Sequence, residues 1–243
     1  MAITIRSVVI SLPVAGPVPE LLYLAAEIAR LMGAELRALY VEDEALFDVA
    51  DLPLAREVDP LRSPDERWRP LAREQLARDF ELAAAALRRR LAEVARAVGV
   101  PVEFSVVRAA TRLPAVFDEL RAHGEFVFVV PAERTADSLP LPAGAVLYAP
   151  AAITRRGGDV IALADRTDAP AARLADRIAR TAHARMIVID AAGDSAELQQ
   201  ALGRLRARLF VAGAEVFAHA DDAARLAALR RVPVIVVPPS ASA

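Results

Sequence analysis

The stretch AAEIARLMGAELRALYVED, at residues 25–43, decides the fold class of this chain. Its first part has apolar residues at helical spacing, and Gly33 follows where a glycine commonly ends a helix. LRALYV (36–41) then has the short apolar pattern of a buried strand. A further apolar run, ITIRSVVISL (3–12), precedes the helix, so the chain opens as strand, helix, strand. Such units build parallel sheets with right-handed crossovers.

The same alternation continues almost to the end of the chain. The remaining expected strands cover residues 102–107, 125–131, 144–150, 159–165, 185–190, 208–213 and 233–239. The remaining expected helices cover residues 71–98, 113–122, 170–184, 195–207 and 221–231. The pattern predicts an α/β protein with two open, mainly parallel sheets flanked by helices, the second sheet being smaller.

An internal repeat divides the chain into two predicted domains. At an offset of 150 residues, six residues of the first helix recur: Leu24, Ala25, Ile28, Ala29, Arg30 and Ala34 match Leu174, Ala175, Ile178, Ala179, Arg180 and Ala184. We therefore expect one domain over residues 1–153 and a shorter one over 159–243, joined by a polar, glycine-containing linker at 154–158. The second domain lacks a counterpart of residues 42–107.

Composition excludes several classes of protein. The 243 residues contain no Cys, and all 30 basic residues are Arg, so thiolate chemistry, disulfides and a Walker A lysine are absent. The 32 acidic residues leave a net charge of -2, which argues against nucleic acid as a partner. No uninterrupted apolar run reaches the roughly 20 residues that a bilayer-spanning helix needs. The sequence predicts a soluble, cytoplasmic protein without membrane contact.

The opening strand, residues 25–43 and the closing LRRVPVIVVPP (229–239) resemble the universal stress protein family, here as a tandem of two such domains in one chain. The resemblance extends over most of the chain, and it implies an adenine-nucleotide alpha-hydrolase-like fold. In that family the ATP-binding members carry an Asp after strand one and a glycine-rich phosphate loop after strand four.

This sequence departs from the nucleotide motifs of the family. In the first half no Asp follows the first strand, and Pro131 stands where the loop would begin. In the second half Asp165 and Gly213 match, which makes them the candidate cofactor-binding residues, but Val216 replaces the second glycine. Asp221 and Asp222 would oppose a triphosphate by Coulomb repulsion. We expect Asp221 to be the N-cap of the last helix, and Asp165 either caps a turn or contacts a ribose.

Two further groups of residues have competing interpretations. Acidic side chains follow the second strand, where they either hold a hard cation such as magnesium or begin a solvated helix; they are Glu42, Asp43, Glu44, Asp48 and Asp51. The histidines have no metal-ligand spacing and are expected at the surface or at helix ends; they are His123, His183 and His219. No catalytic residue and no metal site are predicted.

The predicted function is a non-catalytic stress-response or regulatory protein that binds an unknown protein partner or a small ligand, with no cofactor expected. One alternative is an adenine-nucleotide-binding protein that uses the second half, with ATP bound around Asp165 and Gly213. The other alternative is a structural scaffold for oligomers.

Two structural expectations accompany this interpretation. The strands at 144–150 and 233–239 are expected to pair antiparallel as an internal pseudo-dimer, with Val146 and Val236 near its axis, on which a homo-oligomer can be built. Within the 42–72 excursion, we expect Leu46, Phe47 and Leu52 to fold back over the sheet edge as a mobile lid.

Overall fold

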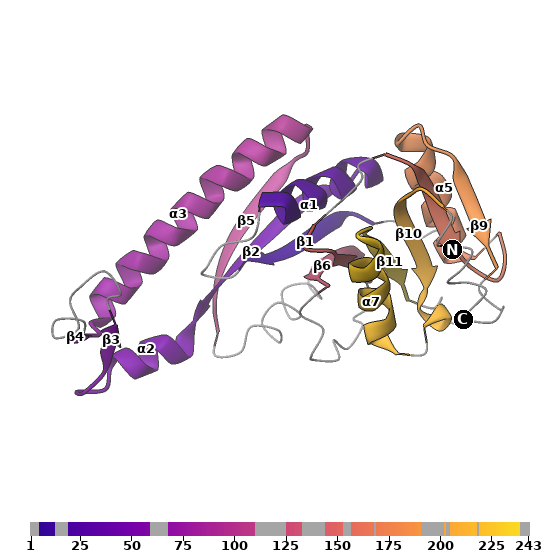
Figure 1. The fold of residues 1–243 in the computed structure, drawn as a ribbon. Coiled ribbons are helices and arrows are strands. Elements are labelled where there is room, and N and C mark those ends of the chain that lie inside the picture. The colour runs from indigo at the N-terminus through magenta and orange to yellow at the C-terminus, as the bar shows by residue number, and fades with distance from the viewer. Residues whose placement is uncertain are drawn as a thin grey trace.

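A single nine-stranded sheet forms the centre of the protein (Figure 1), in the order β5-β2-β1-β6-β7-β11-β10-β8-β9. The computed structural model describes residues 5–12, 19–58, 68–109, 125–132, 144–152, 157–167, 169–190, 202, 205–217 and 219–238. The strands of the sheet are β1 (Ser7–Leu12), β2 (Glu35–Asp43), β5 (Val102–Ala109), β6 (Phe126–Pro131), β7 (Ala145–Ala149), β8 (Asp159–Leu163), β9 (Met186–Ile189), β10 (Ala207–Gly213) and β11 (Val234–Val237). All neighbours pair in parallel except β7 and β11.

The helices follow the apolar periodicity of the sequence. They are α1 (Pro19–Met32), α2 (Glu44–Ala50), α3 (Arg73–Val98), α5 (Pro170–Thr181) and α7 (Ala220–Arg230), with a 3-10 turn at Ala214–Val216. Gly99 ends α3 with φ at 80°, a conformation that glycine adopts at little cost. The helix expected at 113–122 lies outside the described residues, as does most of the one expected at 195–207.

Helices cover both faces of the sheet. Because successive residues of a strand point to opposite faces, Val8 and Ile10 of β1 belong to one apolar cluster and Val9 to the other. The first cluster lies beneath α1, α3 and α5, whereas the second lies against α7 (Figure 1). The fold is therefore a three-layer α/β structure, as the sequence predicted.

The two expected sheets are joined edge to edge into one. β7 and β11 pair antiparallel, with Val146 opposite Val236, which confirms the predicted pairing of these strands. From this join, which we call the seam, the strand order is β7-β6-β1-β2-β5 in one direction and β11-β10-β8-β9 in the other. Counted outward from the seam, the second order repeats the first, and the described residues contain no counterpart of the outer strand β5 in it.

Further contacts link the parts of the chain on either side of the seam. Helix α1 packs against α5 on the same face of the sheet. The carboxylate of Glu27 on α1 forms an ion pair with the guanidinium of Arg208 on β10. Both side chains are largely covered, at 27% and 19% exposed, so this pair is better shielded from solvent than an ordinary surface ion pair.

The segment after β2 extends away from the sheet in a projection that we call the arm (residues 44–58 and 68–72; Figure 1, lower left). It consists of α2 and a small antiparallel hairpin of β3 (Arg56–Val58) and β4 (Trp68–Pro70). The predicted lid is wrong in this respect, since Leu46 and Leu52 are 39% and 59% exposed. Of these three residues only Phe47 is buried, and it stacks on Phe80 of α3.

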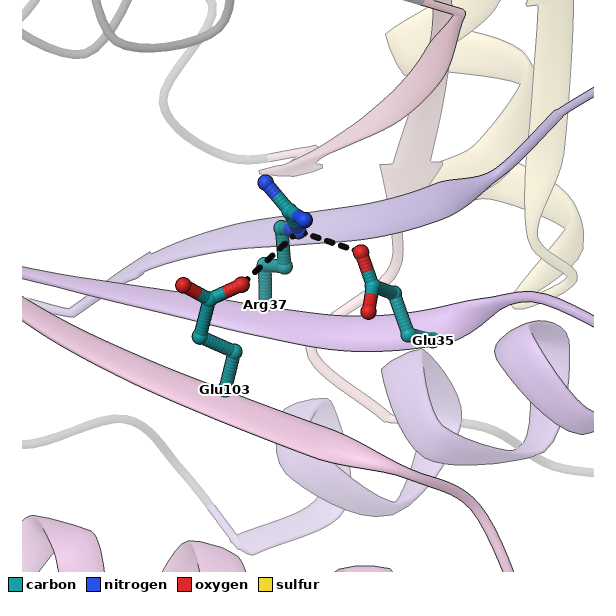
Figure 2. A network of polar contacts seen from close by, with 3 residues as sticks. All are labelled: Glu35, Arg37 and Glu103. Atoms are coloured by element: carbon teal, nitrogen blue, oxygen red, sulfur yellow. Dashed lines mark hydrogen bonds and ion pairs between the residues drawn. The ribbon is translucent and has the colours of Figure 1, made fainter. Parts of the chain in front are cut away.

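An ion-pair network fastens β2 to the edge strand β5 (Figure 2). The Nε atom of Arg37 lies 2.5 Å from a carboxylate oxygen of Glu35 and 3.1 Å from one of Glu103. Arg37 and Glu103 are register partners on the two strands. The network thus links neighbouring strands at the start of β5, a strand in which no residue is fully buried.

Candidate functional site

The two predicted nucleotide-binding residues lie close to each other at one edge of the sheet. Asp165 follows the end of β8, and Gly213 is the last residue of the neighbouring strand β10. The register pairs Leu163 with Ala212, so both residues lie at the carboxyl ends of adjacent parallel strands. From the end of β8 the chain continues toward β9, and from the end of β10 it continues in the opposite direction, toward β11. Open α/β sheets bind ligands at such a point, where two neighbouring strands lead the chain in opposite directions.

The space beside the Cα of Gly213 is already occupied. Its φ of -71° and ψ of 151° are open to any residue, so the backbone does not require glycine here. A Cβ atom built on Gly213 would collide with the carboxylate of Glu215, whose Oε2 would lie 2.6 Å away. The space that a glycine would leave for a phosphate is therefore filled by a negatively charged side chain of this chain.

The start of α7 differs from the expectation in which residue caps it. His219, and not Asp221, is the N-cap residue. The Asp222 carboxylate accepts a hydrogen bond of 3.0 Å from the backbone N–H of His219, which completes a capping box. Asp221 instead lies near Tyr148 of β7, where burial of the phenol, followed by the charge of Asp221, raises the pKa of Tyr148.

In the first half, the structure describes only part of the corresponding edge. β1 and β6 are adjacent, and their carboxyl ends are at Leu12 and Pro131. Pro131 pairs with Ala149, and the N–H of Ala132 donates to the Ala149 carbonyl at 2.7 Å. The connecting segments 13–18 and 133–143 are outside the described residues.

The acidic residues after β2 are dispersed among separate structural roles. Asp43 accepts a 3.0 Å hydrogen bond from Ala45 N–H and thereby caps α2. Asp51 pairs with Arg73 of α3. Within the residues that the structure describes, no three His, Asp or Glu side chains are grouped so that they can hold a metal ion.

Glu42 is the most buried member of this acidic set, and its partner escaped the sequence analysis. Its carboxylate Oε2 accepts hydrogen bonds from Nε and Nη2 of Arg108 on β5, at 3.1 and 2.9 Å. The same guanidinium lies 4.2 Å from the centre of the Phe47 ring. Register explains the pair, because residue 42 of β2 lies opposite residue 108 of β5. This cluster attaches the arm to the sheet.

Tyr40 lies two residues before Glu42 on the same side of β2. It is fully buried, with its ring 6.2 Å from that of Phe80. Its hydroxyl has no hydrogen-bond partner among the described residues. Burial, followed by the charge of Glu42, raises the pKa of Tyr40 above its ordinary value.

Among the described residues, the histidines and the remaining groove do not form a catalytic or binding site. His183 and His219 are both exposed and lie on different elements, and His123 is outside the described residues. A groove of about 380 Å³ lies along α1 and the end of α3, and one of its two acidic side chains, Glu27, forms an ion pair with Arg208. Within the described ranges, no helix combines the length and the apolar character needed to cross a bilayer.

Comparisons with solved structures identify the fold. Over 97% of its length the chain matches a functionally unknown protein of Pseudomonas aeruginosa PAO1, with 93% of that chain covered, 15% identity and a TM-score of 0.57. A protein of strain UCBPP-PA14, provisionally named a universal stress protein, matches with 97% and 94% coverage, 16% identity and a TM-score of 0.54. A universal stress protein from Archaeoglobus fulgidus DSM 4304 matches with 96% and 97% coverage, 11% identity and a TM-score of 0.53.

These similarities are in structure and extend over nearly the whole length of each pair of chains. No protein family model matches the sequence, and no curated protein matches it. At identities of 11–16%, these structural similarities show a shared architecture. This chain has the fold of the universal stress proteins.

Proposed function

We propose that this chain is a non-catalytic stress-response or regulatory protein of the universal stress protein type, which acts by binding a protein partner or a small ligand. The fold supports this role. The main observation against nucleotide binding is that the Glu215 carboxylate lies against Gly213.

The proposal includes a division into two units of one architecture, over residues 1–153 and 159–243, with 154–158 as linker. The mirrored strand order about the seam supports this division. In this interpretation the antiparallel pairing of β7 with β11 makes an internal pseudo-dimer within one chain. Each unit then retains one outer edge, formed by β5 and β9 respectively.

Electrostatics opposes a triphosphate at the second-half edge. A phosphate group binds where backbone N–H groups converge and small residues let it approach. Here Glu215 covers Gly213, and Asp221 lies in the first turn of α7. Each carboxylate repels an anion, and a micromolar affinity requires about 8 kcal/mol of binding free energy. ATP binding at this level is not expected.

The alternative of nucleotide binding has one observation in its favour. Asp165 is exposed and lies beside the end of β10, as the ribose-binding Asp of the resemblance requires. The alternative demands that the Glu215 side chain move off Gly213 when the nucleotide arrives. Neutralising Glu215 would then improve binding.

Titration calorimetry with ATP and magnesium distinguishes the two. The wild-type chain is expected to show no saturable micromolar binding, and Glu215→Gln tests whether the carboxylate is the obstacle. Glu74→Gln, at an exposed position of the first turn of α3, is the matched control for the loss of one charge. Saturable wild-type binding that Asp165→Ala abolishes would establish the alternative and overturn the proposal.

A further inference from the structure

We propose that the guanidinium of Arg177, on helix α5, binds a small phosphate-type oxyanion. This inference goes beyond the proposed function, because it names a ligand class and a site outside the Asp165–Gly213 edge. Arg177 lies two turns into α5, about 10 Å along the helix axis from Pro170 at its start.

Two donors of the Arg177 side chain are buried without a hydrogen-bond partner. Its Nε and Nη2 atoms are covered from solvent, and no acceptor among the described residues bonds to them. Arginine stays charged in proteins, so the side chain cannot relieve this cost by losing its proton. An anion that reaches the two donors removes the cost of a buried, unpaired charge. Because Arg177 as a whole is only partly covered, rotation of its side chain is enough to admit a ligand.

The internal repeat explains why Arg177 lacks a counter-charge. At the offset of 150 residues it corresponds to Glu27 of α1, which forms an ion pair with Arg208 of β10. Arg208 stands at a register irregularity of β10, and such bulges re-aim side chains. At the offset of 82 residues the counterpart of Arg208 is Phe126 of β6, an apolar residue in the cluster that lies against α7. The corresponding strand therefore offers no charge to match Arg177.

The charges on α5 favour an anion as the ligand. Arg173 precedes Arg177 by four residues and Arg180 follows it by three, so the three side chains share one stripe of the helix. The one carboxylate of α5, that of Asp176, pairs with Arg180 at 2.6 Å. The helix keeps a surplus of positive charge, and a phosphate gains more from it than a carboxylate, which carries less negative charge.

Arg108 shows in the same molecule how this edge of a guanidinium binds oxygen. Its Nε and Nη2 atoms donate to Oε2 of Glu42 at 3.1 and 2.9 Å. The same two atoms are the ones without a partner in Arg177. Paired N–H donors of this kind match the oxygens of phosphates and carboxylates, which a single-point donor does not.

Thermal unfolding of the full chain, followed by circular dichroism, measures the binding. Inorganic phosphate is added to a chloride buffer at constant ionic strength, and acetate serves as the carboxylate probe. We expect the unfolding midpoint of the wild type to rise by about 2–4 °C in roughly 20 mM phosphate, and by less than about 1 °C in the same concentration of acetate.

Three variants locate the effect. Arg177→Met removes both donors, so its phosphate shift is expected to fall below about 1 °C, and in chloride alone it is expected to be at least as stable as the wild type. Arg177→Lys keeps the charge without the paired donors and is expected to lose at least about half of the shift. Arg96→Met, at an exposed position of the last turn of α3, is the control and is expected to keep the full shift. General stabilisation by phosphate is common to all variants, so their differences report the site.

Three results would overturn the inference. The first is an equal phosphate shift in the wild type and in Arg177→Met. The second is an acetate shift as large as the phosphate shift. The third is a clear loss of stability of Arg177→Met in chloride alone, which would reveal a partner for the guanidinium within the chain. Asp165→Ala is expected to leave the phosphate shift unchanged, so failure here is distinguishable from failure of the proposed function.

Discussion

Val146 of β7 and Val236 of β11 lie opposite each other in the antiparallel pair that joins the two sides of the sheet. Both are buried, at 1% and 4% exposed, and both belong to the apolar cluster beneath α7. Cross-strand neighbours of this kind are the unit in which a sheet is stabilised. The seam is therefore as much part of the core as any other pair of strands.

A double-mutant cycle at the seam tests this coupling. Val146→Ala and Val236→Ala are each expected to lower the free energy of unfolding by about 1–3 kcal/mol, since each leaves a cavity. In the double mutant, the change in the free energy of unfolding is expected to differ from the sum of the two single changes by at least about 0.5 kcal/mol. Urea unfolding provides the measurement. Val146→Ala combined with Val94→Ala on α3, a site on another part of the fold, is expected to be additive and serves as control.

Removing the partner of Glu42 is expected to destabilise the protein. Arg108→Gln leaves a carboxylate whose side chain is only 11% exposed, and it also removes the cation over the Phe47 ring. Because Arg108 itself is 47% exposed, water replaces part of the lost interaction with Glu42. We expect the free energy of unfolding to fall by about 1–2 kcal/mol. Arg90→Gln, at an exposed position of α3, is the control. Equal denaturation midpoints for the two variants would contradict the role of the pair.

The buried hydroxyl of Tyr40 predicts a substitution that stabilises. Tyr40→Phe removes a polar group that has no partner among the described residues, so the free energy of unfolding at neutral pH is expected to rise by about 1 kcal/mol. Tyr23→Phe, at a 40% exposed position of α1, is expected to change it little. A loss of stability in Tyr40→Phe would instead reveal that the hydroxyl has a bonding partner.

The same residue predicts how stability depends on alkaline pH. Burial raises the pKa of Tyr40 above its ordinary value of 10.0, so the unfolded chain releases this proton at lower pH than the folded one. Stability is therefore unaffected below about pH 10 and falls as the pH rises from there through the folded pKa. Tyr148 acts in the same direction. Between pH 8 and pH 12 the free energy of unfolding is expected to fall less steeply for Tyr40→Phe, because each unit of pKa difference corresponds to about 1.4 kcal/mol.

Two glycines are expected to respond differently to alanine. At Gly213 a Cβ would meet the movable end of the Glu215 side chain, and the backbone conformation suits any residue. Gly213→Ala is therefore expected to lower the free energy of unfolding by less than about 1 kcal/mol. At Gly144 a Cβ would lie 2.6 Å from the backbone oxygen of Phe126, so Gly144→Ala costs about 1–3 kcal/mol. Thermal unfolding of both variants ranks the costs, and the reverse order would refute this assignment.

Local pattern was sufficient to predict most of the fold. The apolar run at residues 36–41 and the apolar stripe of α3 have a periodicity that is visible in the sequence. Gly33 and Gly99 mark helix ends. The three-residue strands β3 and β4 were not predicted, because so short a segment has no detectable alternation. The lid was wrong because the arm projects from the sheet and leaves Leu46 and Leu52 exposed, whereas Phe47 is buried against Phe80, a residue distant in the sequence.

The candidate site was harder to predict than the fold. The resemblance to the universal stress protein family pointed to Asp165 and Gly213, which the structure brings to one edge. It gave no sign that Glu215 would turn back over Gly213, since that depends on the 3-10 turn after β10. The pairing of Glu42 with Arg108 is a matter of strand register, and register between β2 and β5 emerges only when the sheet forms.

The seam also decides how the protein responds to dilution. Between separate molecules, the pairing of two strand edges obeys mass action and is lost when concentration falls. Here β7 and β11 belong to one polypeptide, so the local concentration of one edge near the other is fixed by the chain that links them. The pairing of β7 with β11 is consequently independent of protein concentration.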